Sequence, residues 1–199
     1  MDLNKRSKQL RLDAIKLSKA NGGYHYGGTF SCAEILINLY DKVLTEDDKF
    51  ILSKGHACWI YYILLRERGF NPKLEAHPIY DEHNGVHCTT GSLGHGLPIG
   101  IGRAWAKKMK KENGNVYVLL GDGECQEGTL WESLLTASFR KINNIVAIVD
   151  SNKIQGSGFV DEILPINSLK DVAIACGWEV LIIDGHDNDE IINSLTRPI

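Results

Sequence analysis

Short apolar runs alternate along this chain with longer amphipathic segments. The runs are rich in strand-forming residues and predict strands at 50–52, 116–120, 145–149 and 178–183. The intervening segments predict helices at 1–20, 31–40, 58–68, 98–112, 129–141, 168–176 and 189–195. Such regular alternation predicts a doubly wound α/β fold with a mainly parallel sheet and helices on both faces.

Local signals predict where several of these helices begin and end. Ser31 with Glu34, and Thr129 with Glu132, have the spacing of capping boxes at helix starts. Gly69 follows the segment 58–68 and predicts its end.

Two oxygen-bearing side chains follow neighbouring strands of one predicted βαβ unit. Asp122 comes after the run 116–120, and Asn152 comes after the run 145–149. We therefore expect both at the carboxyl ends of parallel strands, where open α/β sheets bind ligands. A carboxylate and an amide oxygen suit Mg²⁺ or Ca²⁺, and the glycines beside Asp122 allow a phosphate to approach. The alternative is that both residues simply end their strands.

Composition and charge narrow the class of protein. The chain has 199 residues, 43% of them hydrophobic, and a formal net charge of −3. This fits one domain with a real core, and the absence of a dense Lys/Arg block gives no case for nucleic acid or an anionic membrane. No stretch reads as a signal peptide or membrane span, so we expect a cytoplasmic protein. Five scattered cysteines without a CxxC pair suggest reduced thiols.

Histidines stand at several junctions between loops and helices. His25 lies in the glycine-rich stretch 21–30, which we expect to be a loop, and His56 lies between a strand and a helix. Both positions are suited to ligand contact, although loop histidines are more often merely solvated. His83 and His87 have a spacing that suits zinc on a helix, but the Asn-Gly pair at 84–85 favours a turn instead.

The sequence from 121 to 152 resembles the metal and diphosphate motif of thiamine-diphosphate enzymes. Six motifs together resemble the diphosphate-binding domain of transketolase, specifically the N-terminal subunit of two-chain transketolases. They are LSKGHA at 52–57, HP at 77–78, TTGSLGHGLP at 89–98, GDGECQEGTLWES at 121–133, DSNKIQ at 150–155 and GWEVLIIDGHD at 177–187.

Competing motifs fail at particular residues. A dinucleotide fingerprint needs glycine where Gln126 stands, and a P-loop needs lysine where Thr129 follows Gly128. The α subunits of 2-oxoacid dehydrogenases share the GDG and asparagine pattern but lack the blocks at 52–57 and 91–96.

The resemblance implies a role for each matched residue. Metal ligands would be Asp122, Asn152 and the backbone carbonyl of Ile154, binding Mg²⁺ or alternatively Ca²⁺. Thiamine diphosphate would also contact His56, Gly91, Ser92, Leu93 and Gly123. His25 and His77 would act at the substrate's reacting carbons, and Glu127 would lie near the subunit contact as a third catalytic residue. Tyr24 and Tyr26 flank His25, whereas the family usually has glycine before this histidine; this difference would narrow the site mouth or alter the substrate.

The resemblance also implies an activity and a partner. The reaction would transfer a two-carbon ketol unit from a ketose to an aldose, with sugar phosphates as substrates. The cofactor's ring would be bound by a C-terminal subunit with a pyrimidine-binding domain, in a symmetric hetero-oligomer or a homodimer. We expect residues 1–199 to form one diphosphate-binding domain that stops before the family's next strand and a further active-site histidine. An alternative is therefore a non-catalytic or repurposed thiamine-diphosphate-binding module.

Overall fold

The computed structural model describes residues 3–23 and 25–197, which form two compact units. Of the described residues, unit 1 comprises 3–23, 25–45, 54–91 and 183–197, and unit 2 comprises 46–53 and 92–182. That all these segments make one diphosphate-binding domain stays a prediction.

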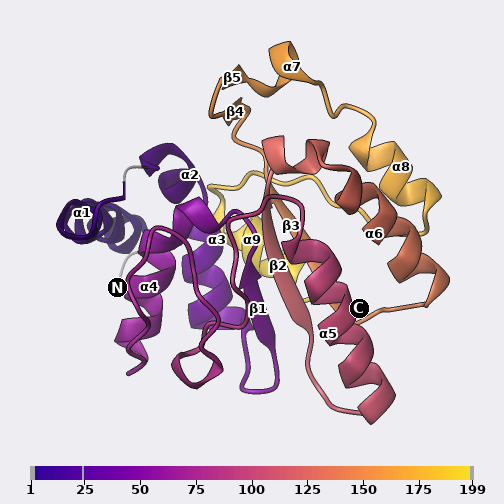
Figure 1. Ribbon diagram of the computed structural model, residues 1–199, viewed down its shortest axis with the longest axis horizontal. Coiled ribbons are helices and arrows are strands. Elements are labelled where there is room, and N and C mark those ends of the chain that lie inside the picture. Colours follow the sequence, from indigo (N-terminus) through magenta and orange to yellow (C-terminus); the bar gives the residue numbers. More distant parts are fainter. Residues whose placement is uncertain (1–2, 24, 198–199) are drawn as a thin grey trace. The chain divides into compact units, whose positions relative to one another are not determined.

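Unit 2 contains a parallel sheet in the order β1-β2-β3 (Figure 1). The strands are β1 (Lys49–Leu52), β2 (Val116–Gly121) and β3 (Ile145–Asp150). Register pairs Leu52 with Leu119 and Gly121 with Asp150, so the carboxyl ends of all three strands lie at one edge. The strands predicted from the first three apolar runs, and the parallel α/β fold, are confirmed.

Helix α5 (Gly96–Lys110) packs on this sheet through a close approach at Gly100. A Cβ atom on Gly100 would lie 2.5 Å from Cγ2 of Val118, so only glycine allows this contact. The predicted end of the helix near residue 112 is two residues late, because Lys111 takes a left-handed conformation with φ of 57°. The remaining helices and strands of unit 2 are η4 (Gly123–Gln126), α6 (Gly128–Phe139), β4 (Ile154–Gln155), β5 (Gly158–Phe159), α7 (Val160–Ile163) and α8 (Leu169–Ala175).

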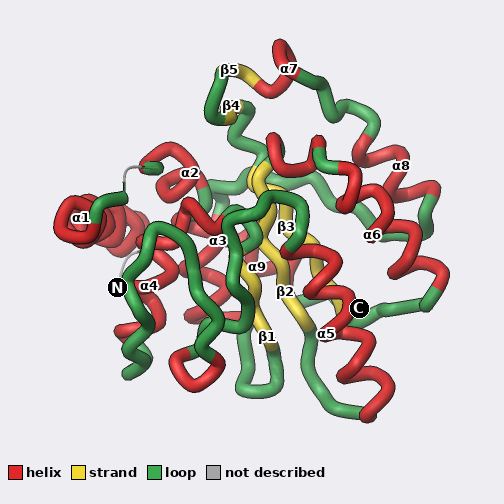
Figure 2. Tube along the Cα trace, in the orientation of Figure 1, coloured by secondary structure: helices red, strands yellow, loops and turns green. Residues whose placement is uncertain are grey.

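The strand predicted at 178–183 is wrong, and Figure 2 shows this segment as loop. Its first residue completes the end of α8, because the Trp178 amide donates to the Ala173 carbonyl at 3.0 Å. The Trp178 indole donates to the Leu134 carbonyl, and Ile182 is 78% exposed. An apolar run signals strand propensity, but a strand also needs a partner edge to pair with.

Unit 1 is helical. Its elements are α1 (Leu3–Asn21), α2 (Tyr26–Ser31), α3 (Ala33–Asn38), the π-helix η1 (Leu39–Val43), η2 (Gly55–Ala57), α4 (Cys58–Glu67), η3 (Glu82–Asn84) and α9 (Asn188–Leu195). The expectation of a loop at 26–30 is wrong, since these residues form most of α2. The Thr29 amide and hydroxyl stabilise this helix by donating to the His25 carbonyl. The predicted stop of α4 is confirmed, since Gly69 has φ of +84°.

Neither predicted capping box forms, although both helices begin within two residues of the predicted position. Ser31 Oγ donates back to the Gly28 carbonyl at 3.4 Å, and Glu34 turns to α1 instead. Thr129 Oγ1 donates to the Gly94 carbonyl at 2.8 Å. At Glu34 and Thr129 a tertiary contact outcompetes the local one.

Glu34 is the buried centre of a polar cluster in unit 1. Arg11 donates to both of its carboxylate oxygens at 2.7 Å, Ser7 donates to Oε1, and His186 Nδ1 lies 3.1 Å from Oε2. Burial alone would raise the pKa of Glu34, but the hydrogen bonds from Arg11 and Ser7 outweigh it and lower the pKa to about 2.

We expect Glu34→Gln to lower the free energy of unfolding at pH 7 by about 2 kcal/mol, because it leaves Arg11 without its charged partner. Since the pKa is lowered on folding, the carboxylate stabilises fully above pH 4.5, and this stabilisation is lost between pH 4.5 and about 2. Urea unfolding at several pH values measures this, with Glu162→Gln on exposed α7 as the control. Equal stability of variant and wild type at pH 7 would contradict the expectation.

All five cysteines are free thiols, as predicted, and four of them are buried. Burial, followed by the nearby charges of Glu124 and Asp122, raises the pKa of the Cys125 thiol. The four buried cysteines serve as small core side chains.

Candidate functional site

Asp122 follows β2 directly, and backbone amides hold both of its carboxylate oxygens. Oδ1 accepts from the Gly123 amide at 2.8 Å, and Oδ2 accepts from the Lys153 amide at 2.6 Å. Asp122 is only 3% exposed, so these hydrogen bonds compensate for the burial of its charge. Each oxygen keeps a further lone pair, which leaves the carboxylate oriented and still able to bind a cation.

The turn from Asn152 to Ile154 brings the end of β3 to Asp122. Asn152 Oδ1 accepts from the Ile154 amide at 2.9 Å, and Lys153 between them has φ of 67°. The left-handed region is uncommon for lysine, and such backbone strain often occurs at functional sites. This turn directs the Lys153 amide toward Asp122.

The donors gathered here fit a hard divalent cation. Asp122 offers carboxylate oxygens, Asn152 an amide oxygen, and Ile154 a backbone carbonyl, which are ligand types that Mg²⁺ and Ca²⁺ prefer. Gly123 lies beside them, where a Cβ atom would be 2.2 Å from Gln155 Oε1. A side chain at this position would displace the Gln155 side chain, so the structure favours glycine here.

The turn that precedes α5 contains Ser92 and Leu93, which the sequence resemblance assigns to cofactor contact in unit 2. Ser92 Oγ lies 3.3 Å from His95 Nδ1, and Leu93 is 37% exposed. Gly94 has φ of +81°, and a Cβ atom there would lie 2.6 Å from Cβ of Glu127. Glu127 itself is exposed and immediately precedes α6.

The predicted histidines belong to unit 1. The rings of His25 and His56 meet edge to face, with centroids 5.2 Å apart. His56 packs against α2, since a Cβ atom on Gly28 would lie 3.0 Å from His56 Nε2. The ring of His77 lies against Gly91, because a Cβ atom added to Gly91 would be 3.4 Å from Cγ of His77. Tyr24 lies outside the described residues, while Tyr26 stacks on Phe30.

The electrostatics of these histidines favour a neutral His77. Burial lowers its pKa, and the charge of His25 lowers it further. A neutral imidazole can accept a proton at one nitrogen and donate one at the other. A neutral His77 can therefore exchange a proton with a group bound beside it.

Sequence reasoning missed two charged residues within the motifs it used. Glu124 is 2% exposed and lies two residues after Asp122, and Lys54 is 1% exposed and precedes the glycine and histidine of the motif at 52–57. The Lys54 side chain passes near α2, where its Cε would be 3.7 Å from a Cβ atom on Gly28. One signal in the sequence could have identified Glu124 and Lys54: each is a charged residue inside an otherwise apolar or glycine-rich motif.

Residues 3–197 match the family model described as transketolase, thiamine diphosphate binding domain. The chain belongs to the transketolase family. The predicted resemblance is thereby confirmed, including the thiamine diphosphate-binding character of the domain.

Single subunits of two transketolases match almost the whole chain. One subunit of the apulose-4-phosphate transketolase of Phocaeicola vulgatus is 35% identical, over 98% of this chain and 75% of the relative. The 6-deoxy-6-sulfo-D-fructose transketolase subunit SqwG of Clostridium sp. is 32% identical, over 99% of this chain and 79% of the relative. The chain is thus homologous to the N-terminal subunit of two-subunit transketolases.

Solved transketolases have the same fold. The Campylobacter jejuni transketolase superposes with a TM-score of 0.85 at 31% identity, over 97% of this chain, and the Leishmania mexicana transketolase with 0.88 at 23%, over 98%. The present chain covers 35% of the length of the Campylobacter jejuni protein and 34% of the length of the Leishmania mexicana protein. Within its described part, none of the helices has the length and apolar character needed to cross a membrane.

Proposed function

We propose that this chain is the cofactor-binding subunit of a two-subunit transketolase, which transfers a two-carbon ketol unit from a ketose to an aldose. The observation that carries the proposal is the oxygen-rich turn at the carboxyl ends of β2 and β3. There Asp122 is held by amides from Gly123 and Lys153, in a chain whose family binds thiamine diphosphate.

In this proposal, the cofactor's diphosphate is bound through Mg²⁺ or Ca²⁺. Asp122, Asn152 and the Ile154 carbonyl are the metal ligands, and Gly123 contacts the diphosphate, as does the turn at 91–93. When bound, thiamine diphosphate supplies the electron sink for breaking and forming the carbon–carbon bond. The chain's own contribution is to orient the diphosphate and neutralise its charge.

Unit 1 supplies proton transfer. His56 contacts the diphosphate, and its edge-to-face contact with His25 supports a shared ligand environment for the two rings. His77 is kept neutral by burial, so it accepts a proton from a substrate hydroxyl and returns it in the second half of the reaction. Glu127, exposed before α6, is assigned to the contact with the partner.

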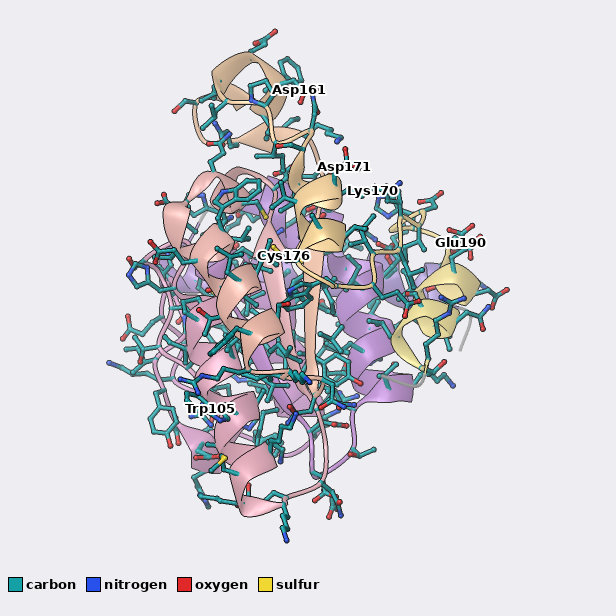
Figure 3. All side chains as sticks on the ribbon, turned by 90° about the vertical axis from the view of Figure 1, so that its right-hand side faces the viewer. Trp105, Asp161, Lys170, Asp171, Cys176 and Glu190 are labelled. Carbon is teal, nitrogen blue, oxygen red and sulfur yellow. The ribbon has the colours of Figure 1, made fainter. Side chains whose placement is uncertain are left out.

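The proposed partner is a C-terminal subunit that binds the cofactor's pyrimidine ring. Two relatives that match almost the whole chain, described above, are themselves named as subunits. Exposed apolar side chains on α5 and α6 support such a contact: Met109 is 72% exposed, Leu135 62% and Phe139 79%. The Arg140 guanidinium lies over the rings of Trp105 and Phe139, with its Cζ 4.6 Å and 5.3 Å from their centroids, and Figure 3 shows Trp105 on α5.

A reconstitution assay tests the function. The chain, coexpressed with its C-terminal subunit, should form a new ketose from a ketose phosphate donor and an aldose acceptor only when thiamine diphosphate and Mg²⁺ are both present. The donor panel should include the sugars named for the relatives. Metal-dependent cofactor binding without turnover on any donor would favour a non-catalytic module, and no binding even in the complex would overturn both interpretations.

A further inference from the structure

Glu124 is a buried carboxylate that joins three separate segments of unit 2. It is 2% exposed and lies in η4, two residues after Asp122. Its Oε1 accepts from the Gly94 amide at 2.9 Å and from the Ser53 hydroxyl, and its Oε2 accepts from the Gly121 amide at 3.1 Å. The donors come from the turn before α5, the end of β1 and the end of β2.

A carboxylate suits this position better than any neutral side chain. Three donors point at its two oxygens, and an ionised carboxylate is an acceptor only. Glutamine would keep the shape but place an NH₂ group opposite a donor. If the oxygen of this glutamine faced Ser53 and Gly94, its NH₂ group would face the Gly121 amide. Two N–H donors would then oppose each other in a buried space.

The turn before α5 is also fixed through the carbonyl group of Gly94. The Gly94 carbonyl accepts from Thr129 Oγ1 at 2.8 Å, and a Cβ atom on Gly96 would lie 2.2 Å from Ser53 Oγ. The amide of Gly94 is therefore fixed by Glu124 and its carbonyl by α6. Two of the segments tied to Glu124, the turn and the end of β2, carry residues assigned above to the diphosphate and its metal.

We propose that Glu124 is a positioning residue for thiamine diphosphate: it holds the turn at Ser92–Gly94 and the Gly121–Asp122 strand end in the spacing that the diphosphate requires. This rests on the proposed function, because the residues it positions are cofactor ligands only in that scheme. Glu124 itself touches backbone and Ser53, so it acts through them and is not a catalytic residue.

The first test measures the turn in the chain without any cofactor. Glu124→Gln should speed hydrogen–deuterium exchange of the peptide covering residues 92–95 by about tenfold, because the Gly94 amide loses the charge of its acceptor. Exchange in β2 from Val116 to Leu120, which does not bond to the Glu124 side chain, should stay slow, and this shows that the variant is folded. Glu132→Gln, an exposed glutamate on α6, is the matched control and should exchange like wild type. Unchanged exchange at 92–95 in the folded Glu124→Gln variant would contradict the proposal.

The second test measures thiamine diphosphate affinity by calorimetry in the two-subunit complex at saturating Mg²⁺. Glu124→Gln should weaken binding by about tenfold at a temperature where it is fully folded, which a purely structural role would not do. Ser53→Ala removes one donor and should weaken binding less, so it covers the case in which Glu124→Gln fails to fold. Unchanged affinity in the folded variants would overturn the role of Glu124, whereas failure of the wild type to bind would overturn the proposed function.

Discussion

Asp122→Ala should abolish metal-dependent binding of thiamine diphosphate, with a loss of affinity of at least about 100-fold at saturating Mg²⁺. The change removes a carboxylate that the Gly123 and Lys153 amides hold in one orientation. Without it, the Asn152 oxygen and the Ile154 carbonyl are too few and too weakly charged to retain the cation, so the diphosphate charge is left uncompensated. Calorimetry on the two-subunit complex, with and without Mg²⁺, measures both affinities.

Two further variants make this result interpretable. Asp122→Asn keeps the size of the side chain and should also lose metal-dependent binding, which separates loss of charge from loss of volume. Asp161→Ala changes an exposed aspartate in α7 and should bind cofactor like wild type. Cofactor affinity unaffected by either change at Asp122, in folded protein, would refute the metal assignment.

The sheet was predictable because its strands are defined by their own sequence. The residues of β2 from Val116 to Leu120 are all buried, so an uninterrupted apolar run was a sufficient signal. The run at 178–183 gave a similar signal but forms no strand, because pairing depends on a partner edge that the local sequence does not encode. The capping box at Glu34 failed for a related reason, since its carboxylate binds Arg11 from another helix.

The candidate site was predictable where strand ends carry the ligands. Asp122 and Asn152 follow β2 and β3, and parallel pairing of Gly121 with Asp150 brings the two ends together. The contribution of Glu124 was not predictable, because its Ser53 donor lies 71 positions earlier. The histidines were predictable only in part. His25 and His56 could be recognised in the sequence by their positions just before helices, but the contact between their rings became known only from the structure.

His77→Ala should lower kcat by about 10²–10⁴-fold while leaving thiamine diphosphate affinity unchanged, because His77 is assigned to proton transfer and not to the diphosphate. His83→Ala, an exposed histidine of η3, is the matched control and should keep wild-type turnover. Steady-state kinetics and calorimetry on the same complexes separate the two effects. Wild-type kcat in His77→Ala would remove His77 from the mechanism.

The pH dependence gives an independent readout of the same histidine. Burial and then the charge of His25 lower the pKa of His77, so it stays neutral as the pH falls through 6.5 and becomes protonated only below that value. Wild-type turnover should therefore hold at pH 6.5 and decline only at lower pH. Because His25 contributes to the shift, His25→Ala should move the pKa of His77 back up toward 6.5, which NMR titration of the imidazole can follow without any turnover. A His77 pKa that does not rise in His25→Ala would show that the two rings are not electrostatically coupled.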